Sequence, residues 1–552
     1  MFNYCNIIIL LFLSVCQKCW CNICTTCTCS NTESLINCHG KHLKTNELLN
    51  YELLTLDQHQ LLNKLILSKN DIAVLPTNEL KNLKQLKMLD LSENQLESVH
   101  SDVLKYLSDL EELDYSHNLI RNFDLSVLNT VLSKFNLSYN QINNLENSLE
   151  RTKKFTRTKL KIFDVSHNNL SDLNFLNTLP EVQYLDLSFN KLSALSDSLF
   201  HLKHLEVLHI DNNQLLFLKF QHLPLSLLEL NVGNNFINTL SLSFQKSFIY
   251  TLNIQNNQIF EIHKNLSSLT KLKHLNISGN LLSNFPDISL EQLEVLDLSF
   301  NNITIIPKTV SINNFPNLRI LKVNGNCLKD ITLRSKLELE SFEANFVETI
   351  EKIDENAFLM LKEKNDCINV TISNNVKLSS IAENVFHHMN ICSLDLSNNH
   401  FTYLSFELFK THVYGKNFSN ARYLINLQKN PFICDCSLQW MLDELVPKLY
   451  TIQPSLLEDL KCAGPSPLMN KRLIHWYKWK EKVFCDDFSH YAEKMAVNVT
   501  AVSNKQIVTF ESSHAMIAVL AAATALLAVL TMVGVLLTRR IAEKRRRANR
   551  RF

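Results

Sequence analysis

One pattern of hydrophobic and polar positions recurs along most of the chain. The string L-x-x-L-x-L-x-x-N-x-L appears as LKMLDLSENQL from Leu86 and as LEVLDLSFNNI from Leu293. Most successive asparagines are separated by 21 to 25 residues, and their positions are 70, 94, 118, 140, 168, 190, 213, 235, 257, 280, 301, 326, 375, 399 and 430. The 49-residue gap after Asn326 is two periods long, so residues 339–350 are predicted to hold a degenerate unit. About sixteen units of one supersecondary structure are expected.

The alternating leucines of L-x-L predict a short strand with one buried face. A single strand of this kind has nothing to bury against, whereas strands stacked in register form a parallel sheet over a continuous leucine core. The asparagine turns the chain inward, and its amide can pair with backbone groups that the turn leaves unbonded. The looser second half of each unit suits irregular turns or short helices. The pattern predicts an α/β repeat solenoid with a concave parallel sheet.

Apolar runs that lack the repeat lie near both ends. Residues 7–15 (IIILLFLSV) are too short to span a bilayer and are typical of a signal-peptide core, which predicts a signal peptide over residues 1–21. Cleavage after Cys16 or after Cys21 is compatible with the small residues required. Residues 515–537 contain no charge, and at ~1.5 Å per residue they form about 34 Å of helix, enough to cross a bilayer.

The charges that follow this predicted membrane helix predict its orientation across the membrane. Residues 538–552 contain eight basic residues and one acidic residue, and basic residues stay in the cytoplasm. We therefore expect a single-pass plasma-membrane protein with its N-terminus outside and a short stalk over residues 487–514. The tail is too short for an inner signalling domain. Small residues spaced by four, at Ala518 and Ala522, are consistent with a weak homodimer.

Composition argues against catalysis. The chain has only seven glycines, and no six-residue window holds two, so no Walker loop, dinucleotide fingerprint or nucleophile elbow can be written. There is no H-E-x-x-H motif, and the grouped histidines His201, His204 and His209 lack a metal-ligand spacing. A sequence pI near 7.6 does not indicate nucleic-acid binding. We expect neither an enzyme nor a cofactor or metal protein.

Fifteen cysteines and eight N-x-S/T sequons indicate the secretory route. The sequons are Asn136, Asn169, Asn265, Asn276, Asn302, Asn369, Asn417 and Asn498. Cys24, Cys27, Cys29 and Cys38 precede the repeats, and Cys434, Cys436, Cys462 and Cys485 follow them. Spacing alone leaves three pairings open in each group of four.

The repeat together with these two cysteine groups resembles the extracellular leucine-rich repeat family, over about residues 24–486. The resemblance implies an N-terminal cap (residues 22–60), repeats (61–429) and a C-terminal cap (430–486). It also implies the disulfides Cys24–Cys29, Cys27–Cys38, Cys434–Cys462 and Cys436–Cys485. The chain resembles the outer part of Toll-like receptors and of insect leucine-rich cell-adhesion proteins. Outside the caps, Cys367 and Cys392 suit either a bridge or two buried thiols, and the state of Cys327 is open.

Exposed strand positions between the buried leucines are the expected ligand surface, because solenoids use extended concave faces for binding. Asp90, Glu93, Glu111, Glu112 and Asp114 predict an acidic patch for a basic ligand, although an aspartate at this position is also a habit of the repeat. Tyr184, Phe189, His209, Tyr250 and His274 add rings that could anchor a protein. His117 and His167, just before the repeat asparagine, are interpreted as ordinary variable positions. The sequons Asn136 and Asn276 are predicted to point to the same face.

These features together predict a cell-surface glycoprotein that binds an extracellular or membrane protein, as an adhesion molecule or a recognition co-receptor. Two alternatives stay open. One is a regulatory subunit that binds a neighbouring membrane protein, and the other is a decoy receptor that captures a ligand without signalling.

Overall fold

The computed structural model describes residues 23–30, 32–45, 62–75, 80, 83–99, 104, 106–125, 128, 131–146, 159–195, 197–241, 247–409, 424–476 and 482–485. These residues belong to two compact units. The first unit runs to Pro431 and includes Lys448–Lys461, and the second comprises Phe432–Pro447 and the residues from Cys462 onward.

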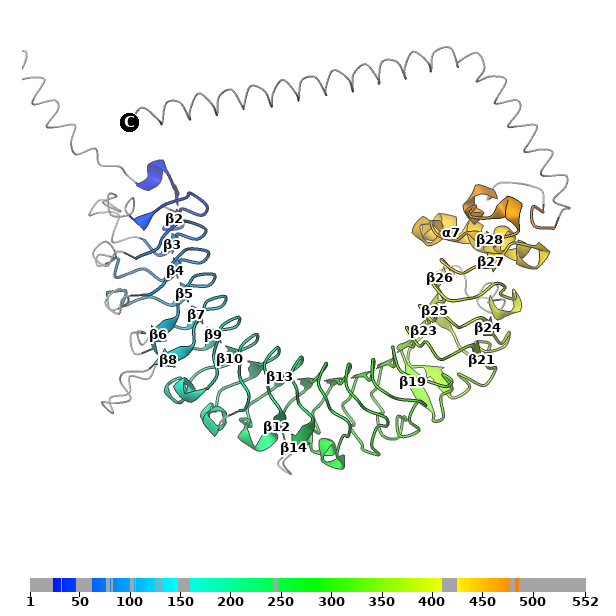
Figure 1. Cartoon of the computed structure of the whole chain (residues 1–552), viewed down its shortest axis with the longest axis horizontal. Coiled ribbons are helices and arrows are strands. Elements are labelled where there is room, and N and C mark those ends of the chain that lie inside the picture. Colours follow the sequence, from blue (N-terminus) through cyan, green and yellow to red (C-terminus); the bar gives the residue numbers. More distant parts are fainter. Residues whose placement is uncertain are drawn as a thin grey trace, which may run out of the picture. The chain divides into compact units, whose positions relative to one another are not determined.

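The first unit is built on one long sheet, which has 18 strands within the described part of the chain. Figure 1 shows its strands following one another along the inner side of an arc. Seventeen of them are parallel to their neighbours along the row: β2 (Leu35–Asn37), β3 (Lys64–Ile66), β4 (Met88–Asp90), β5 (Glu112–Asp114), β7 (Lys134–Asn136), β9 (Ile162–Asp164), β10 (Tyr184–Asp186), β11 (Val207–His209), β13 (Glu229–Asn231), β15 (Thr251–Asn253), β16 (His274–Asn276), β17 (Val295–Asp297), β18 (Ile320–Lys322), β20 (Ser341–Glu343), β23 (Ile368–Thr371), β25 (Ile391–Asp395) and β26 (Leu424–Asn426).

The register of the sheet stacks equivalent repeat positions. Between β10 and β11, for example, Tyr184 lies opposite Val207 and Leu185 opposite Leu208. The central leucines of both strands are fully buried, whereas their neighbours stay partly exposed. The predicted concave parallel sheet over a leucine core is therefore confirmed. The predicted degenerate unit contains β20, and Val347 takes the place of the asparagine there.

The repeated asparagines, which we call the asparagine column, hold the turns together, as the sequence predicts. The Asn257 amide donates to the carbonyls of Val232 (3.1 Å), Ile254 (3.1 Å) and Gln255 (3.1 Å), and its Oδ1 accepts from the Ile237 N–H (2.9 Å). The side chain thus ties its own turn to the preceding unit. Only a neutral amide can donate to several carbonyls and accept an N–H at once, which explains the residue type.

Short elements fill the outer side of the first unit. They are the 3₁₀ helices η4 (Asn174–Thr178), η5 (Asp197–His201), η6 (Phe220–His222) and η7 (Lys264–Ser268), and the parallel pairs β6 (Asn122–Asp124) with β8 (Asn144–Glu146), β12 (Phe217–Lys219) with β14 (Thr239–Ser241), β19 (Leu337–Leu339) with β22 (Leu361–Glu363) and β21 (Lys352–Ile353) with β24 (Ser380–Ile381). Figure 1 places β6, β8, β12 and β14 on the outer side of the arc.

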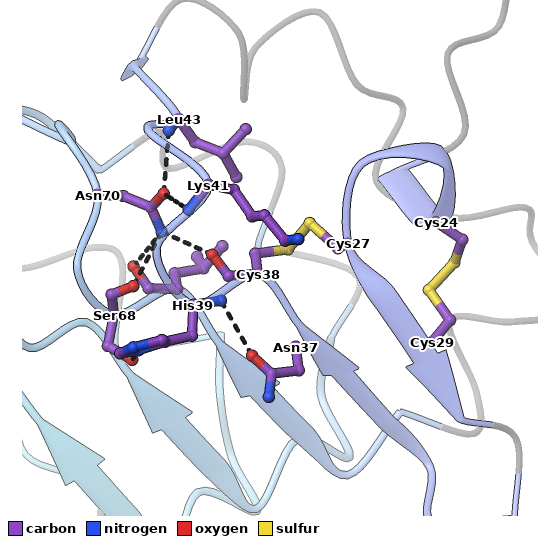
Figure 2. Close-up of a disulfide and its surroundings, with 11 residues drawn as sticks. Cys24, Cys27, Cys29, Asn37, Cys38, His39, Lys41, Leu43, Ser68 and Asn70 are labelled. Atoms are coloured by element: carbon purple, nitrogen blue, oxygen red, sulfur yellow. Dashed lines mark hydrogen bonds between the residues drawn. A yellow bond between two sulfur atoms is a disulfide. The ribbon is translucent and has the colours of Figure 1, made fainter.

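Disulfides close the N-terminal end of the sheet. The helix η1 (Ile23–Thr25) leads to β1 (Thr28–Ser30), which pairs antiparallel with β2. Cys24 is bonded to Cys29 and Cys27 to Cys38, as the family resemblance implies (Figure 2). The Asn70 amide donates to the Cys38 carbonyl at 2.9 Å, which joins the asparagine column to the cap (Figure 2).

The second unit is small and also rich in disulfides. Its parallel strands are β27 (Phe432–Ile433) and β28 (Cys462–Gly464), and its helical turns are η8 (Cys436–Leu438), the π-helical η9 (Met441–Leu445), η11 (Ser466–Leu468) and η12 (Leu473–Trp476). The helix α7 (Val446–Ile452) and the turn η10 (Pro454–Leu457) follow η9 and precede β28 in the chain. The structure contains the disulfides Cys434–Cys462 and Cys436–Cys485, the two pairs that the resemblance implies.

The remaining cysteines differ from one another. Cys367 and Cys392 form a disulfide, so the bridged alternative holds for that pair, and Cys327 is a free, exposed thiol. Among the residues that the structure describes, no helix is both long and apolar enough to cross a bilayer. The predicted signal peptide (1–21), stalk (487–514), membrane helix (515–537) and basic tail (538–552) lie outside the described residues.

Removing one side chain of the asparagine column should make the neighbouring strands open more easily. We expect Asn257→Ala to lower the free energy of local opening of β13, β15 and β16 by about 2 kcal/mol or more, because buried carbonyls lose their donor. Hydrogen–deuterium exchange of these strands measures the effect. Gln258→Ala, at the adjacent exposed position, is the control and should leave exchange unchanged. Equal exchange in the two variants would mean that the amide is dispensable.

The Tyr115 hydroxyl is a weak point of the core. Tyr115 is fully buried against Phe123 and Phe135, its hydroxyl has no hydrogen-bond partner among the described residues, and burial raises its pKa. Tyr115→Phe removes an unpaired polar atom without opening a cavity, so we expect about 1 kcal/mol of added stability in thermal unfolding. Tyr184→Phe, whose hydroxyl contacts His209, should give no such gain. A less stable Tyr115→Phe protein would show that the hydroxyl has a partner.

Candidate functional site

The earlier half of the concave sheet, from β4 to β11, presents a column of polar side chains. The third residues of successive strands lie side by side, in the order Asp90, Asp114, Asn136, Asp164, Asp186 and His209. We call these residues the acidic column. Neighbouring strands are ~4.8 Å apart, so four carboxylates line a short stretch of the sheet.

Each aspartate of the acidic column also has a structural role. The Asp114 carboxylate accepts the Ser116 N–H at 2.8 Å, and Asp164 and Asp186 accept the N–H groups of Ser166 and Ser188 at 2.9 Å. One oxygen of each aspartate therefore closes the turn after the strand. This bond explains why aspartate recurs throughout the repeat, and it leaves the second carboxylate oxygen for other contacts.

Asp164 sits at the most unfavourable place in the acidic column. Burial raises the pKa of its carboxyl above the ordinary value, the bonds from Ser166 oppose this effect, and the charges of Asp186 and Asp114 raise it further. The negative charge here is incompletely solvated and has negative neighbours. A cation brought to this point would relieve both costs.

The structure divides the predicted acidic patch. Lys87 binds Glu111 at 3.0 Å and Lys134 binds Glu112 at 2.7 Å, so these two glutamates are already paired with cations. Glu93 lies beyond the strand, in the turn before Asn94, where its φ is 52°. Asp90 and Asp114 do lie together. Next to them are Asn136, which the sequence predicts as a sequon on this face, and Asp164, which the sequence pattern did not single out as a site.

A shallow pocket of about 250 Å³ opens above this part of the acidic column. Its walls include the apolar Met88, Ile162 and Tyr184 and the carboxylates of Asp114 and Asp164, and the ion pair of Lys134 with Glu112 also lines it. An apolar wall with carboxylates beside it matches a lysine or arginine side chain, whose hydrocarbon stem and charged head need different surroundings.

His209 ends the acidic column and links two strands. Its Nδ1 lies 3.4 Å from the Tyr184 hydroxyl and 3.6 Å from an Asp186 oxygen, and its Nε2 lies 3.4 Å from Glu229. The hydrogen bond to Asp186 raises the pKa of His209, burial opposes the shift, and Glu229 adds to the rise. Burial and nearby carboxylates raise the pKa of Tyr184 to about 12. The predicted site residues Tyr184 and His209 are thus in contact, whereas Tyr250 precedes β15, two strands farther along.

Beyond β15 the concave face pairs its own charges. Lys273 binds Glu294 at 3.0 Å, and Arg319 bridges Glu294 (3.6 Å) and Glu340 (2.8 Å). Lys322 binds Glu343 at 3.2 Å. The acidic column, by contrast, gathers four aspartates on strands β4 to β10, and none of them has a lysine or arginine partner among the described residues.

A second feature was missed at the level of the sequence. The rings of His117, Tyr139, His167 and Phe189 form a continuous stack, with centroids 4.1, 3.8 and 3.9 Å apart and planes within 12° of parallel. We call these four residues the aromatic rim. Interpreting His117 and His167 as ordinary variable positions did not anticipate that their rings stack with Tyr139 and Phe189. The sequence did contain the necessary information, because all four rings stand just before a repeat asparagine. When the units stack in register, residues at the same repeat position become neighbours in space.

A shallow, wide-open groove of about 750 Å³ runs along the aromatic rim. Gln141 and Lys191 also line it, and none of the described residues around it is acidic. Within the described ranges, no group of three or more histidine, cysteine, aspartate or glutamate side chains is arranged to hold a metal ion.

The His209 contacts predict a pH-dependent contribution to stability. A histidine whose pKa is raised by folding adds stability that is fully present below its unfolded value of ~6.5 and is lost as the pH rises through the folded pKa. We therefore expect His209→Gln to lower the thermal midpoint more at about pH 5.5 than at about pH 9. The exposed His274→Gln on β16 is the matched control. A pH-independent loss in His209→Gln would show that the histidine acts by packing alone.

Family models match parts of the repeat array. The model described as "Leucine rich repeat" matches residues 60–120 and 158–215, and the model described as "Leucine Rich repeats (2 copies)" matches residues 291–335.

Three relatives share the repeat segment. An adenylate cyclase of Schizosaccharomyces pombe is 34% identical over 180 residues, which are 31% of this chain and 10% of the relative. Human oligodendrocyte-myelin glycoprotein is 33% identical over 160 residues, 27% of this chain and 36% of the relative. Toll-like receptor 6 of Dasypus novemcinctus is 31% identical over 179 residues, 31% of this chain and 23% of the relative. The matched segment is therefore well under half of each relative. The chain is a leucine-rich repeat protein with an N-terminal disulfide cap, and its relatives include Toll-like receptors and other leucine-rich repeat proteins.

Proposed function

We propose that this chain is a single-pass cell-surface glycoprotein whose repeats bind another protein, as an adhesion molecule or a recognition co-receptor. The sequons, the cap disulfides and the uncharged run over residues 515–537 support this placement. The names of two relatives, a glycoprotein and a receptor, support it as well. The adenylate cyclase shares only 10% of its length, so its named activity is not carried over.

The acidic column is the observation that supports the choice of surface. Its carboxylates lack cationic partners of the kind that Glu111, Glu112 and the glutamates beyond β15 have, except at His209. The ligand is therefore a protein with a basic surface. One of its lysine or arginine side chains enters the pocket above Asp114 and Asp164, with its stem against Met88 and Ile162. The mechanism is complementarity of shape and charge.

Glycans should leave this surface free. The Asn136 amide donates to Asp114 at 3.1 Å, and the Asn276 amide donates to Gln255 at 2.9 Å. We propose that these two half-buried sequons stay unmodified, because the amide nitrogen that a glycan would need is hydrogen-bonded. The exposed sequons Asn302 and Asn369 are better acceptors. Asn369 lies on β23, so a glycan there would obstruct only a later part of the concave face.

Reversing charge in the acidic column should abolish ligand binding. A screen of extracellular proteins against the full-length chain supplies the ligand. We expect Asp114→Lys with Asp164→Lys to weaken its binding by at least about tenfold and to flatten its salt dependence. Lysine is tolerated at this strand position, as Lys322 on β18 shows.

Charge reversal at the same strand position elsewhere is the matched control. Asp297→Lys with Asp395→Lys changes equivalent aspartates on β17 and β25 and should leave binding within about twofold. Unchanged affinity in the Asp114/Asp164 variant, or equal losses in both variants, would rule out the acidic column as the binding surface.

A further inference from the structure

The aromatic rim puts bulky rings where the backbone disfavours them. His117, Tyr139, His167 and Phe189 have φ between 52° and 54°, the left-handed region. Elsewhere the same repeat position holds residues that tolerate this conformation, such as Asn212, Asn234 and Gly279, and also isolated bulky residues such as Phe300 and Phe346. Four consecutive rings therefore occupy a position for which asparagine and glycine are better suited.

Burial does not account for these rings. Tyr139 is 45% exposed and Phe189 is 44% exposed, and His117 is exposed as well. The stack fixes the ring orientations before any ligand arrives, so a partner that packs against the ring edges loses little side-chain freedom on the protein's side. Exposed, pre-ordered aromatic side chains are characteristic of binding hot spots.

The aromatic rim runs beside the acidic column. In each of these units the ring follows the third strand residue by three positions, as His167 follows Asp164 and Phe189 follows Asp186. A ligand bound to the acidic column thus has an apolar surface within reach at the edge of the sheet.

We propose that the aromatic rim is the apolar half of one composite binding surface, which takes a polypeptide segment carrying both basic and aromatic or aliphatic side chains. The basic side chains contact Asp114 and Asp164, and an apolar side chain packs into the groove against Tyr139 and Phe189. This inference rests on the proposed function, because the acidic column supplies the charge half. Among the described residues that line the groove, Lys191 alone carries a permanent positive charge, which is too little for a sulfated glycan held by its charge.

A displayed library of random peptides, selected on the full-length chain, supplies the probe. We expect the enriched peptides to combine lysine or arginine with at least one aromatic or aliphatic residue. Tyr139→Asn with Phe189→Asn should weaken their binding by at least about tenfold while keeping its salt dependence. Asparagine suits the left-handed backbone at both positions, so the variant should fold. Phe300→Asn with Phe346→Asn, at the same repeat position, is the control and should bind within about twofold.

A double-mutant cycle separates contact from indirect effects. Replacing the peptide's apolar residue by alanine should weaken binding to the wild-type chain but have little further effect on the Tyr139/Phe189 variant. The inference is overturned if the peptide truncation costs the same in both proteins. It is also overturned if Tyr139→Asn with Phe189→Asn, the rim variant, binds the peptides within twofold of wild type, or if no selected peptide depends on Tyr139 and Phe189.

The same peptides distinguish this inference from the proposed function. Loss of binding in Asp114→Lys with Asp164→Lys, with no loss in the rim variant, refutes the composite surface and leaves the charged site standing. Loss in the rim variant alone refutes the charged site, and with it the composite surface.

Discussion

The fold depends on the need to satisfy buried backbone groups at every turn of the coil. Each unit reverses direction inside the core, where water cannot reach the carbonyls that the turn exposes. The asparagine amide meets this need, as at Asn94, whose Nδ2 donates to Leu67, Leu91 and Ser92 while its Oδ1 accepts from Ile72. Because each amide reaches into the preceding unit, the turns are locked at one spacing and one register. The stacked columns on the surface follow from that register.

This constraint also explains how sites arise on a repeat scaffold. A residue type repeated at one position becomes a row of neighbours in space, although its members are more than 20 residues apart in sequence. Aspartates that individually close turns become a line of like charges, and at Asp164 the neighbouring charges add to the rise in pKa that burial causes. Rings that individually occupy a strained turn become a stack. The proposed binding surface therefore consists of residues from one repeat position in several successive units.

The sequence was sufficient for the solenoid, since the leucine and asparagine positions carry the core and the turns, and the family resemblance supplied the cap pairs such as Cys27–Cys38. The candidate site was only partly accessible. Glu111 and Glu112 looked available because the lysines that bind them lie one unit away, and sequence distance hides cross-strand pairs. Asp164 was missed as a site residue because its environment depends on Asp114 and Asp186, and the aromatic rim was missed because no single unit contains two of its rings.

The most direct test of this account is a footprint of the bound protein ligand on the full-length chain, measured by hydrogen–deuterium exchange. The account predicts protection in β4 to β11 and in the turns that carry Tyr139 and Phe189, with the strands from β17 to β25 unchanged. Protection confined to β17–β25 would contradict it, because the acidic column and the aromatic rim lie outside those strands.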